Sequence, residues 1–334
     1  MFVIDNYILA VAFCFITMLC WGSWANTQKL SSEKWPFQLF YWDYTFGIFL
    51  ITLLFAFTLG SNGDVGRHFL TDLSQADRHY LESAFIGGVI FNFANLLLVI
   101  GIEIAGMAIA FPIGIGIALV LGVFTNYIAL PEGNPYVLMM GVSLVAIAII
   151  IDGIAYKKIL QNSNESPFKG ILISATAGIA MGFFYKFVAT SMAVDFVTPE
   201  AGKLTPYTAL VIFSIGIIAS NFLFNTLNMY FPVSGEKVNF KDYFKMGSPK
   251  LHRIGLLGGI IWGIGMSLNI LASEQAGPAI AYGLGQGATL VAAIWGVFIW
   301  KEFKDLPPKN SWLIPLMFIL FVLGIILIIT AKLV

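Results

Sequence analysis

The sequence predicts an all-α integral membrane protein whose ten transmembrane helices form two five-helix units of opposite topology, a 5+5 inverted-topology repeat. Two observations carry this prediction. The chain is 58% hydrophobic and only 11% charged, and one stretch of it occurs twice. Because water-soluble domains carry roughly 25% charged residues, most of this surface must face lipid.

The repeated stretch begins at Glu103 and again at Glu274. Residues 103–116 read EIAGMAIAFPIGIG and residues 274–287 read EQAGPAIAYGLGQG, an offset of 171 positions. At this offset, 14 of the 36 residues from 85 to 120 are identical to their partners in 256–291. We therefore expect residues 1–160 and residues 165–334 to be two copies of one unit.

Ten apolar runs are long enough to cross the hydrocarbon layer, which takes about 20 residues of helix. The predicted spans are 7–28, 37–59, 81–102, 107–129, 135–156, 169–193, 206–230, 254–273, 278–300 and 310–331. The first span follows an N-terminus, MFVIDN, that has no basic region, so it is interpreted as a retained helix rather than a signal peptide.

Lysines and arginines are divided unevenly between the two faces. Linkers 1–2, 5–6, 7–8 and 9–10, with the residues at their edges, hold 13 of them, whereas the opposite face holds 4. The positive-inside rule places these linkers and the uncharged 3–4 hairpin in the cytoplasm, with both termini outside, in a membrane that we expect to be the bacterial inner membrane. Five spans per unit is an odd number, so the second unit enters the membrane inverted, as in many secondary transporters.

Several classes of function have no support in the residues. The net charge is zero, which argues against a nucleic-acid partner, and the three histidines lie in polar loops, so a metal or haem site within the membrane has no ligands. No HExxH, G-x-S-x-G or phosphate-binding loop is present. We expect neither an enzyme nor a cofactor, and any energy for transport must come from an ion or solute gradient.

Span 9 carries a polar stripe. Tyr282, Gln286 and Thr289 fall at i, i+4 and i+7, on one face of a continuous helix. Polar side chains within lipid are costly and usually face a bundle interior. Tyr282 and Gln286 are therefore predicted to bind the solute; the alternative is that this stripe holds helices together.

Amides and tryptophans supply the other predicted solute contacts. Asn92 and Asn95 share a face of span 3, and Asn269 follows Trp262 at i+7 on span 8. Amides suit hydroxyl, urea or imide groups, although an amide bridge between helices is the competing interpretation. The final predicted contacts are the span 1 residues Trp21 and Trp24, which would either stack on a solute ring or belt the membrane interface.

Four charged residues are candidates for coupling or gating. Asp43 lies among aromatic residues in YWDY and is the best candidate proton carrier if span 2 starts deeper, or else an interfacial residue. Lys186, in span 6, either binds solute or snorkels outward. Glu103 and Glu274, at equivalent ends of spans 3 and 8, would either cap equivalent gates on opposite faces or contact headgroup water.

Three segments resemble a known family. CWGSWANTQKL (20–30), FYWDYTFG (40–47) and WGVFIWKEFK (295–304), together with the repeat, resemble the drug/metabolite transporter superfamily, in the branch that contains bacterial glucose/ribose and rhamnose porters and plant ureide permeases. The resemblance implies uptake or export of a small solute, often coupled to protons, through a cavity lined by spans 1, 3, 4, 6, 8 and 9.

The predicted function is therefore gradient-driven transport of a small, mostly neutral polar solute, such as a sugar, a ureide or a nucleobase, by alternating access. The alternative is an exporter of hydrophobic or cationic compounds, as in multidrug permeases. Proton and sodium both remain open as the coupling ion, and sodium could bind backbone carbonyls at a broken helix near Pro112. Membrane lipid is the other expected partner, and a monomer would suffice for transport.

Overall fold

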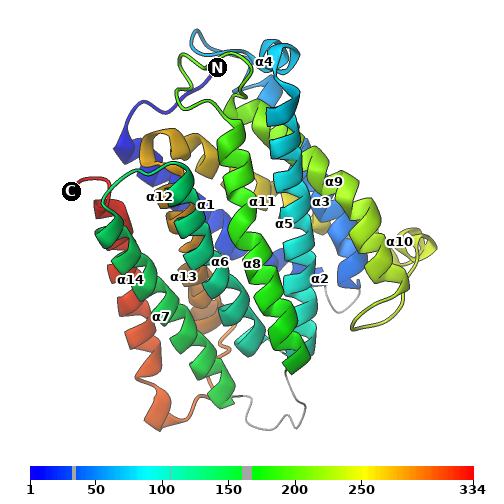
Figure 1. The fold of residues 1–334 in the computed structure, drawn as a ribbon. Coiled ribbons are helices and arrows are strands. Elements are labelled where there is room, and N and C mark those ends of the chain that lie inside the picture. The colour runs from blue at the N-terminus through cyan, green and yellow to red at the C-terminus, as the bar shows by residue number, and fades with distance from the viewer. Residues whose placement is uncertain (32–34, 106, 160–167) are drawn as a thin grey trace.

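The computed structural model is a bundle of long helices and describes residues 1–31, 35–105, 107–159 and 168–334 (Figure 1). In this part of the chain ten helical segments are long and apolar enough to span a membrane, which confirms the predicted integral membrane fold. The boundary between the two predicted units, at 160–165, falls outside the described residues.

The ten spans agree closely with the predicted runs. They are α1–α2 (Tyr7–Ser23 and Ala25–Ser31), α3 (Phe37–Phe57), α5 (Arg78–Ala105), α6 (Met107–Ala129), α7 (Pro135–Ile159), α8 (Phe168–Ser191), α9 (Pro206–Tyr230), α11 (Pro249–Ala276), α12 (Pro278–Gln286) with α13 (Ala288–Ile294) and η1 (Trp295–Ile299), and α14 (Leu313–Thr330). Short helices α4 (Phe69–Gln75), α10 (Phe240–Met246) and η2 (Pro308–Asn310) lie in the linkers.

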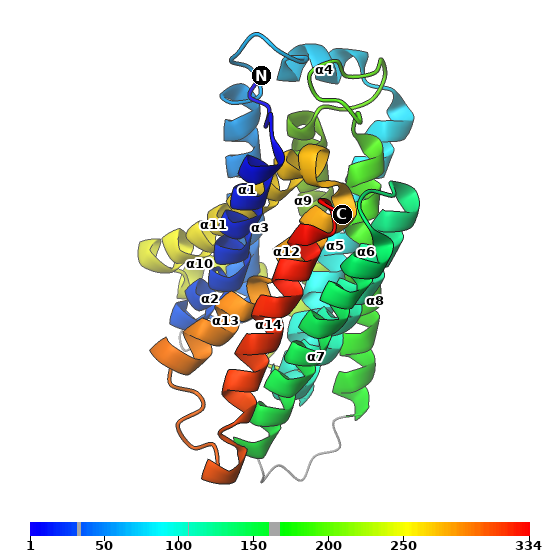
Figure 2. The same cartoon turned by 90° about the vertical axis from the view of Figure 1, so that its left-hand side faces the viewer.

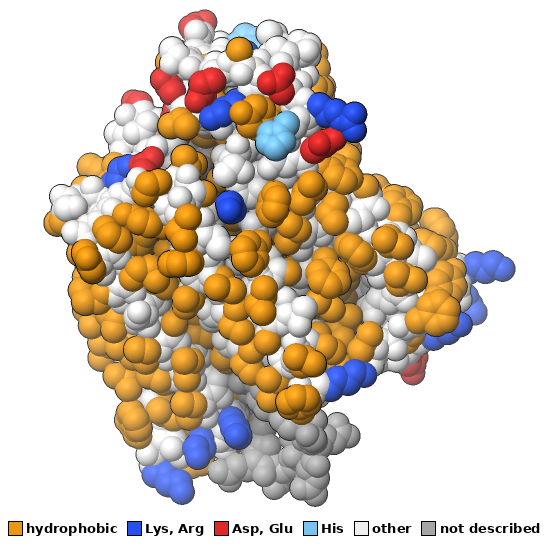
Figure 3. All heavy atoms as spheres, viewed as in Figure 1, with side chains coloured by type: hydrophobic (Ala, Val, Ile, Leu, Met, Phe, Trp, Pro, Cys, Tyr) orange, Lys and Arg blue, Asp and Glu red, His pale blue; other side chains and the backbone are white. Residues whose placement is uncertain are grey.

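Both chain termini lie at one end of the bundle, the upper face of Figures 1 and 2, and the helices α2, α7 and α13 end at the opposite, lower face. Surface side chains differ between the middle of the bundle and its two ends. Hydrophobic side chains cover the middle of the molecule, and charged ones gather near both ends and over α10 (Figure 3).

Helices of one predicted unit make many of the same contacts as their counterparts in the other unit. α11 packs against α1 and α3, and its counterpart α5 packs against α8 and α9, the counterparts of α1 and α3. Helix α6 packs against α8, as α12 and α13 pack against α1, and α6 also packs against α7. Further contacts join counterparts to each other, namely α3 with α9, α7 with α14, and α6 with α12. This is the pattern that a two-fold relation between the units would produce.

Glycines make the same close approach in both units. A Cβ at Gly88 of α5 would overlap the carbonyl oxygen of Phe213 in α9, and a Cβ at Gly259 of α11 would overlap the carbonyl oxygen of Tyr44 in α3. Gly88 and Gly259 are 171 positions apart, the offset of the sequence repeat. Small residues of this kind let helix backbones pack closely in membranes.

Span 9 is not the continuous helix that the sequence predicts. It breaks at Gly287, which packs against Met18 of α1, and its last turn is a π-helix from Trp295 to Ile299. Helix α6, by contrast, continues through Pro112. The break therefore lies in the second unit, away from the position near Pro112 that we considered for sodium.

Candidate functional site

A cavity of about 470 Å³ is lined by helices from both halves of the chain. It runs from Phe91 and Trp262, in the middle of α5 and α11, to Lys29, Tyr156 and Glu302, near the lower ends of their segments. This volume is in the range that holds a small-molecule ligand. The cavity reaches the lower helix ends of the bundle, so this conformation faces the side that the lysine distribution assigns to the cytoplasm.

Five tryptophans and four amides are among the residues that line the cavity. The tryptophans are Trp21, Trp24, Trp262, Trp295 and Trp300, and the amides are Asn26, Gln28, Asn95 and Gln286. Indole rings offer flat apolar faces, and amides both donate and accept hydrogen bonds. The cavity can therefore hold a flat or ring-shaped polar molecule.

Aromatic rings close the cavity toward the upper face. Trp262 stacks on Trp21, with ring centroids 5.8 Å apart and planes 11° apart, and lies 4.4 Å from the ring of Phe91. Phe184 and Phe213 complete this cluster, at 5.2 Å and 5.7 Å from Phe91. We call these five residues the aromatic barrier.

Five of the predicted solute-binding residues lie on the cavity: Trp21, Trp24, Asn95, Trp262 and Gln286. Asn95 is 5% exposed and donates to the hydroxyl of Tyr41 over 3.1 Å, and Gln286 is 8% exposed. The break at Gly287 leaves Gln286 and Thr289 on the cavity, whereas Tyr282 lies outside its lining.

The other three predicted binding residues join helices in this conformation. Asn92 donates to the hydroxyl of Ser220 over 2.9 Å, and Asn269 donates to the carbonyl of Ala281 over 2.8 Å. The hydroxyl of Tyr282 donates to the carbonyls of Ala118 and Met181. Each of the three is fully buried, which is the helix-bridging arrangement considered as their alternative.

Of the four charged candidates, Glu103 alone lines the cavity. Its repeat partner Glu274 lies at the upper end of α11, where it accepts a hydrogen bond of 2.5 Å from the backbone N–H of Phe196 in the α8–α9 linker. The two equivalent carboxylates therefore occupy an open end and a closed end. Lys186, half-buried on α8, is outside the cavity lining.

Asp43 lies apart from the cavity, near the lower end of α3. The residue is 4% exposed, and its carboxylate accepts from the Tyr243 hydroxyl over 2.5 Å and lies 2.9 Å from Nδ1 of His252. Burial, and then the hydrogen bond to Asp43, raise the pKa of the Tyr243 hydroxyl, so it remains a proton donor. Asp43 thus holds α10 and α11 against α3.

Sequence reasoning missed two acids on the cavity, Asp152 and Glu302. Glu302 forms an ion pair of 2.6 Å with Lys29, which also lies 4.2 Å from the ring centre of Trp300. Asp152 is close enough to Glu302 to interact electrostatically, and its Oδ1 is buried without a hydrogen-bond partner among the described residues. Asp152 could have been found as the one acid within the run 135–156.

Comparison with known proteins agrees with this architecture. The family model for ureide permeases matches residues 154–331, more than half of the chain. The chain belongs to the ureide permease family. It is 24% identical to Ureide permease 1 of Arabidopsis thaliana over 97% of both chains, and 25% identical to Ureide permease 3 of the same plant over 84% of this chain and 89% of that one.

A bacterial relative and a solved structure extend the comparison. The probable glucose uptake protein of Staphylococcus aureus is 24% identical over 66% of this chain and 68% of its own. A solved crystal structure shares the fold, with a TM-score of 0.61 and 13% identity over 95% of both chains. The relatives of this ureide permease family member are named as permeases and uptake proteins, which confirms a membrane transporter rather than an enzyme.

Proposed function

We propose that this ureide permease family member moves a small, mostly neutral polar solute, a ureide, a nucleobase or a sugar, by gradient-driven alternating access. The observation that carries the proposal is the cavity of tryptophans and amides that ends at the aromatic barrier, halfway along α5 and α11. The names of the plant and bacterial relatives support these solute classes.

The proposed mechanism uses the two units, residues 1–160 and 165–334, as an inverted repeat. Two observations support this arrangement: equivalent helices of the two units make similar contacts, and equivalent glycines pack against the same kind of backbone position. In such a repeat the units can exchange conformations, which closes the lower face and opens the upper one around a fixed central site. The lower face would be cytoplasmic in a bacterial inner membrane, with both termini outside.

We propose proton coupling through the acids of the cavity. Glu103, Asp152 and Glu302 line it against a single lysine, Lys29, among the described lining residues. A proton or another cation would reduce this excess of negative charge within the membrane, where unpaired charge is costly. Sodium is the competing ion in the test.

Counterflow in proteoliposomes tests the transport proposal. Vesicles loaded with an unlabelled ureide, nucleobase or glucose should take up the same labelled solute faster than empty vesicles. An imposed pH gradient should drive accumulation, and a sodium gradient of equal size should not. Absence of exchange for all three solute classes would contradict the proposal.

Export of cationic aromatic compounds is the second candidate. The three acids and five tryptophans of the cavity favour it, because indole faces and carboxylates both attract cations. A cationic dye that competes with counterflow, or that is itself extruded from vesicles, would favour this function. A neutral ureide, nucleobase or sugar that outcompetes the dye would favour the first.

A further inference from the structure

We infer that the lower end of the α3–α9 face is a binding site for an anionic phospholipid, with one acyl chain in a groove between α3 and α9 and the phosphate against the cationic surface of α10. Two features of the molecule, one apolar and one charged, meet at this place. The inference does not depend on which solute the cavity carries.

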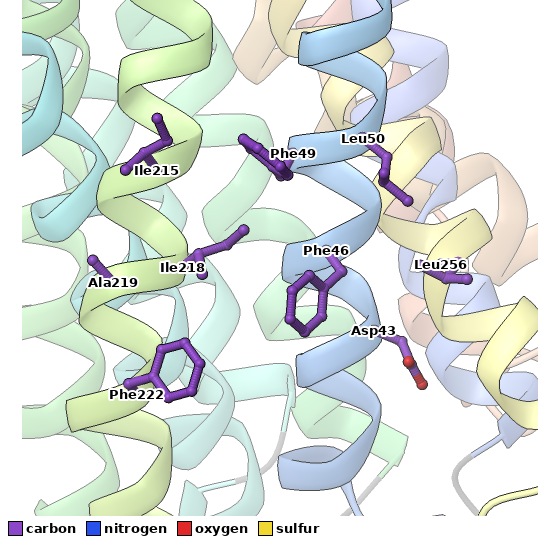
Figure 4. Close-up of a pocket in the computed structure, with 9 residues that line it drawn as sticks. All are labelled: Asp43, Phe46, Phe49, Leu50, Ile215, Ile218, Ala219, Phe222 and Leu256. Atoms are coloured by element: carbon purple, nitrogen blue, oxygen red, sulfur yellow. The ribbon is translucent and has the colours of Figure 1, made fainter.

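The apolar feature is a groove of about 710 Å³ on the outer surface of the bundle (Figure 4). Phe46, Phe49 and Leu50 of α3 line one side, and Ile215, Ile218, Ala219 and Phe222 of α9 line the other. Among the described residues that line it, Asp43 is the one with a charge, and that carboxylate is already bonded to Tyr243 and His252. The other side chains that line the groove are apolar, which suits an acyl chain.

The charged feature is the segment 232–253, which contains α10. Its five cations, Lys237, Lys241, Lys245, Lys250 and Arg253, are all exposed, and its acids are Glu236 and Asp242. Asp242 is used internally, because its side chain accepts from the Asn239 backbone in the capping box of α10. Figure 3 shows Lys and Arg side chains gathered over the projecting α10.

Exposed aromatic residues accompany these cations. Phe231, Phe240 and Phe244 are 74%, 39% and 78% exposed. Phe240 and Phe244 are one helical turn apart, as are Lys241 and Lys245, so α10 presents apolar and cationic side chains next to each other. A short helix with this composition lies in the interface of a membrane, where basic clusters attract anionic lipids.

Trp42 connects the two features. Its ring lies 4.9 Å from that of Phe222, in the groove, and 5.5 Å from that of Phe240, in α10. The groove therefore ends where α10 begins. A phospholipid with one chain between α3 and α9 would have its phosphate at the level of Lys241 and Lys245.

Native mass spectrometry of the full chain in detergent tests the site, with phosphatidylglycerol and phosphatidylcholine of identical acyl chains as the probes. Wild-type protein should retain phosphatidylglycerol in preference to phosphatidylcholine. Replacing both lysines, Lys241→Gln with Lys245→Gln, should weaken phosphatidylglycerol binding by about tenfold or more. The matched control, Lys157→Gln with Lys158→Gln, removes two exposed lysines at the end of α7 and should leave the preference intact.

A groove variant tests the acyl chain separately. Ala219→Trp should fill the groove and reduce binding of both lipids, whereas Leu172→Trp, at an exposed position on α8, should not. Equal retention of the two lipids by wild-type protein, or equal loss in the two lysine double variants, would overturn the inference. Displacement of the lipid by free glycerol phosphate would also overturn it, because the site would then bind a soluble phosphate.

Discussion

Gln286 lies at the end of α12, where span 9 breaks beside the cavity. It is one of the amides best placed to bond a solute that stacks on the tryptophans. We predict that Gln286→Ala abolishes counterflow while the protein stays folded, because it removes an amide on the cavity that would bond the solute.

Asn92 offers the matched control for Gln286. It is also an amide within a span, but it is fully buried and bonded to Ser220, outside the cavity lining. Asn92→Ala should lower stability by roughly 0.6 kcal/mol and keep counterflow. Wild-type counterflow in Gln286→Ala would remove Gln286 from the site.

Asp152 is the residue at which we expect coupling to be separable from transport. Asp152→Asn keeps the shape of the side chain and removes its capacity to gain and lose a proton. We predict that counterflow continues in this variant and that accumulation driven by a pH gradient is lost. The control is Asp305→Asn, which changes an exposed acid on the same face and should behave as wild type. Unchanged pH-driven accumulation in Asp152→Asn would show that the proton binds elsewhere.

Asp72 stabilises the upper face rather than the cavity. Fully buried, it accepts hydrogen bonds from the backbone and hydroxyl of Thr205 and from Arg67, which also donates to three carbonyls of the α8–α9 linker. Asp72→Ala should cost about 2 kcal/mol and lower the Tm, measured in detergent. The exposed Asp64→Ala should not, and an equal Tm for the two variants would contradict this role.

Among the helices, the length of each apolar run predicts the spans well, because the bilayer imposes that length on any helix that crosses it. The bilayer fixes how many residues a helix needs, and the ten runs found in the sequence match ten helical segments within a few residues. The same pattern does not show the break in span 9. At that break Gly287 packs against Met18, and a contact between residues so far apart in the chain is not visible in the sequence.

Glycines set the spacing of the helices in both units. Gly88→Ala and Gly259→Ala should each destabilise the protein by about 1–3 kcal/mol, because the added methyl group meets a backbone carbonyl of α9 or α3. Gly116→Ala is the control, since a Cβ there meets nothing within 4 Å. Thermal unfolding in detergent should give similar losses for the first two variants and none for the third; a loss in one unit only would argue against equivalent packing.

The candidate site shows where sequence reasoning stops. Helical spacing identified polar side chains that must avoid lipid, and it found Trp21, Asn95 and Gln286 on the cavity. It could not separate these from Asn92 and Asn269, which avoid lipid equally well by bonding neighbouring helices. That distinction depends on which helices face each other.

For the whole molecule, the proposed transport cycle requires two units of opposite topology that open one cavity to alternate faces. Ile102 and Ser273 are equivalent positions in the two units, 171 residues apart. Ile102 lines the open cavity, whereas Ser273 is 3% exposed near the closed upper end. Their accessibility should change in opposite directions during transport.

Cysteine labelling at these two positions is the most direct test. In a background where Cys14 and Cys20 are replaced by serine, Ile102→Cys and Ser273→Cys would be labelled in membrane vesicles of known orientation with a membrane-impermeant thiol reagent. We predict that Ile102→Cys reacts only from the cytoplasmic face and Ser273→Cys only from the outer face, and that conditions which increase one labelling rate decrease the other. Reaction of both cysteines from the same face, or rates that rise together, would contradict alternating access between two inverted units.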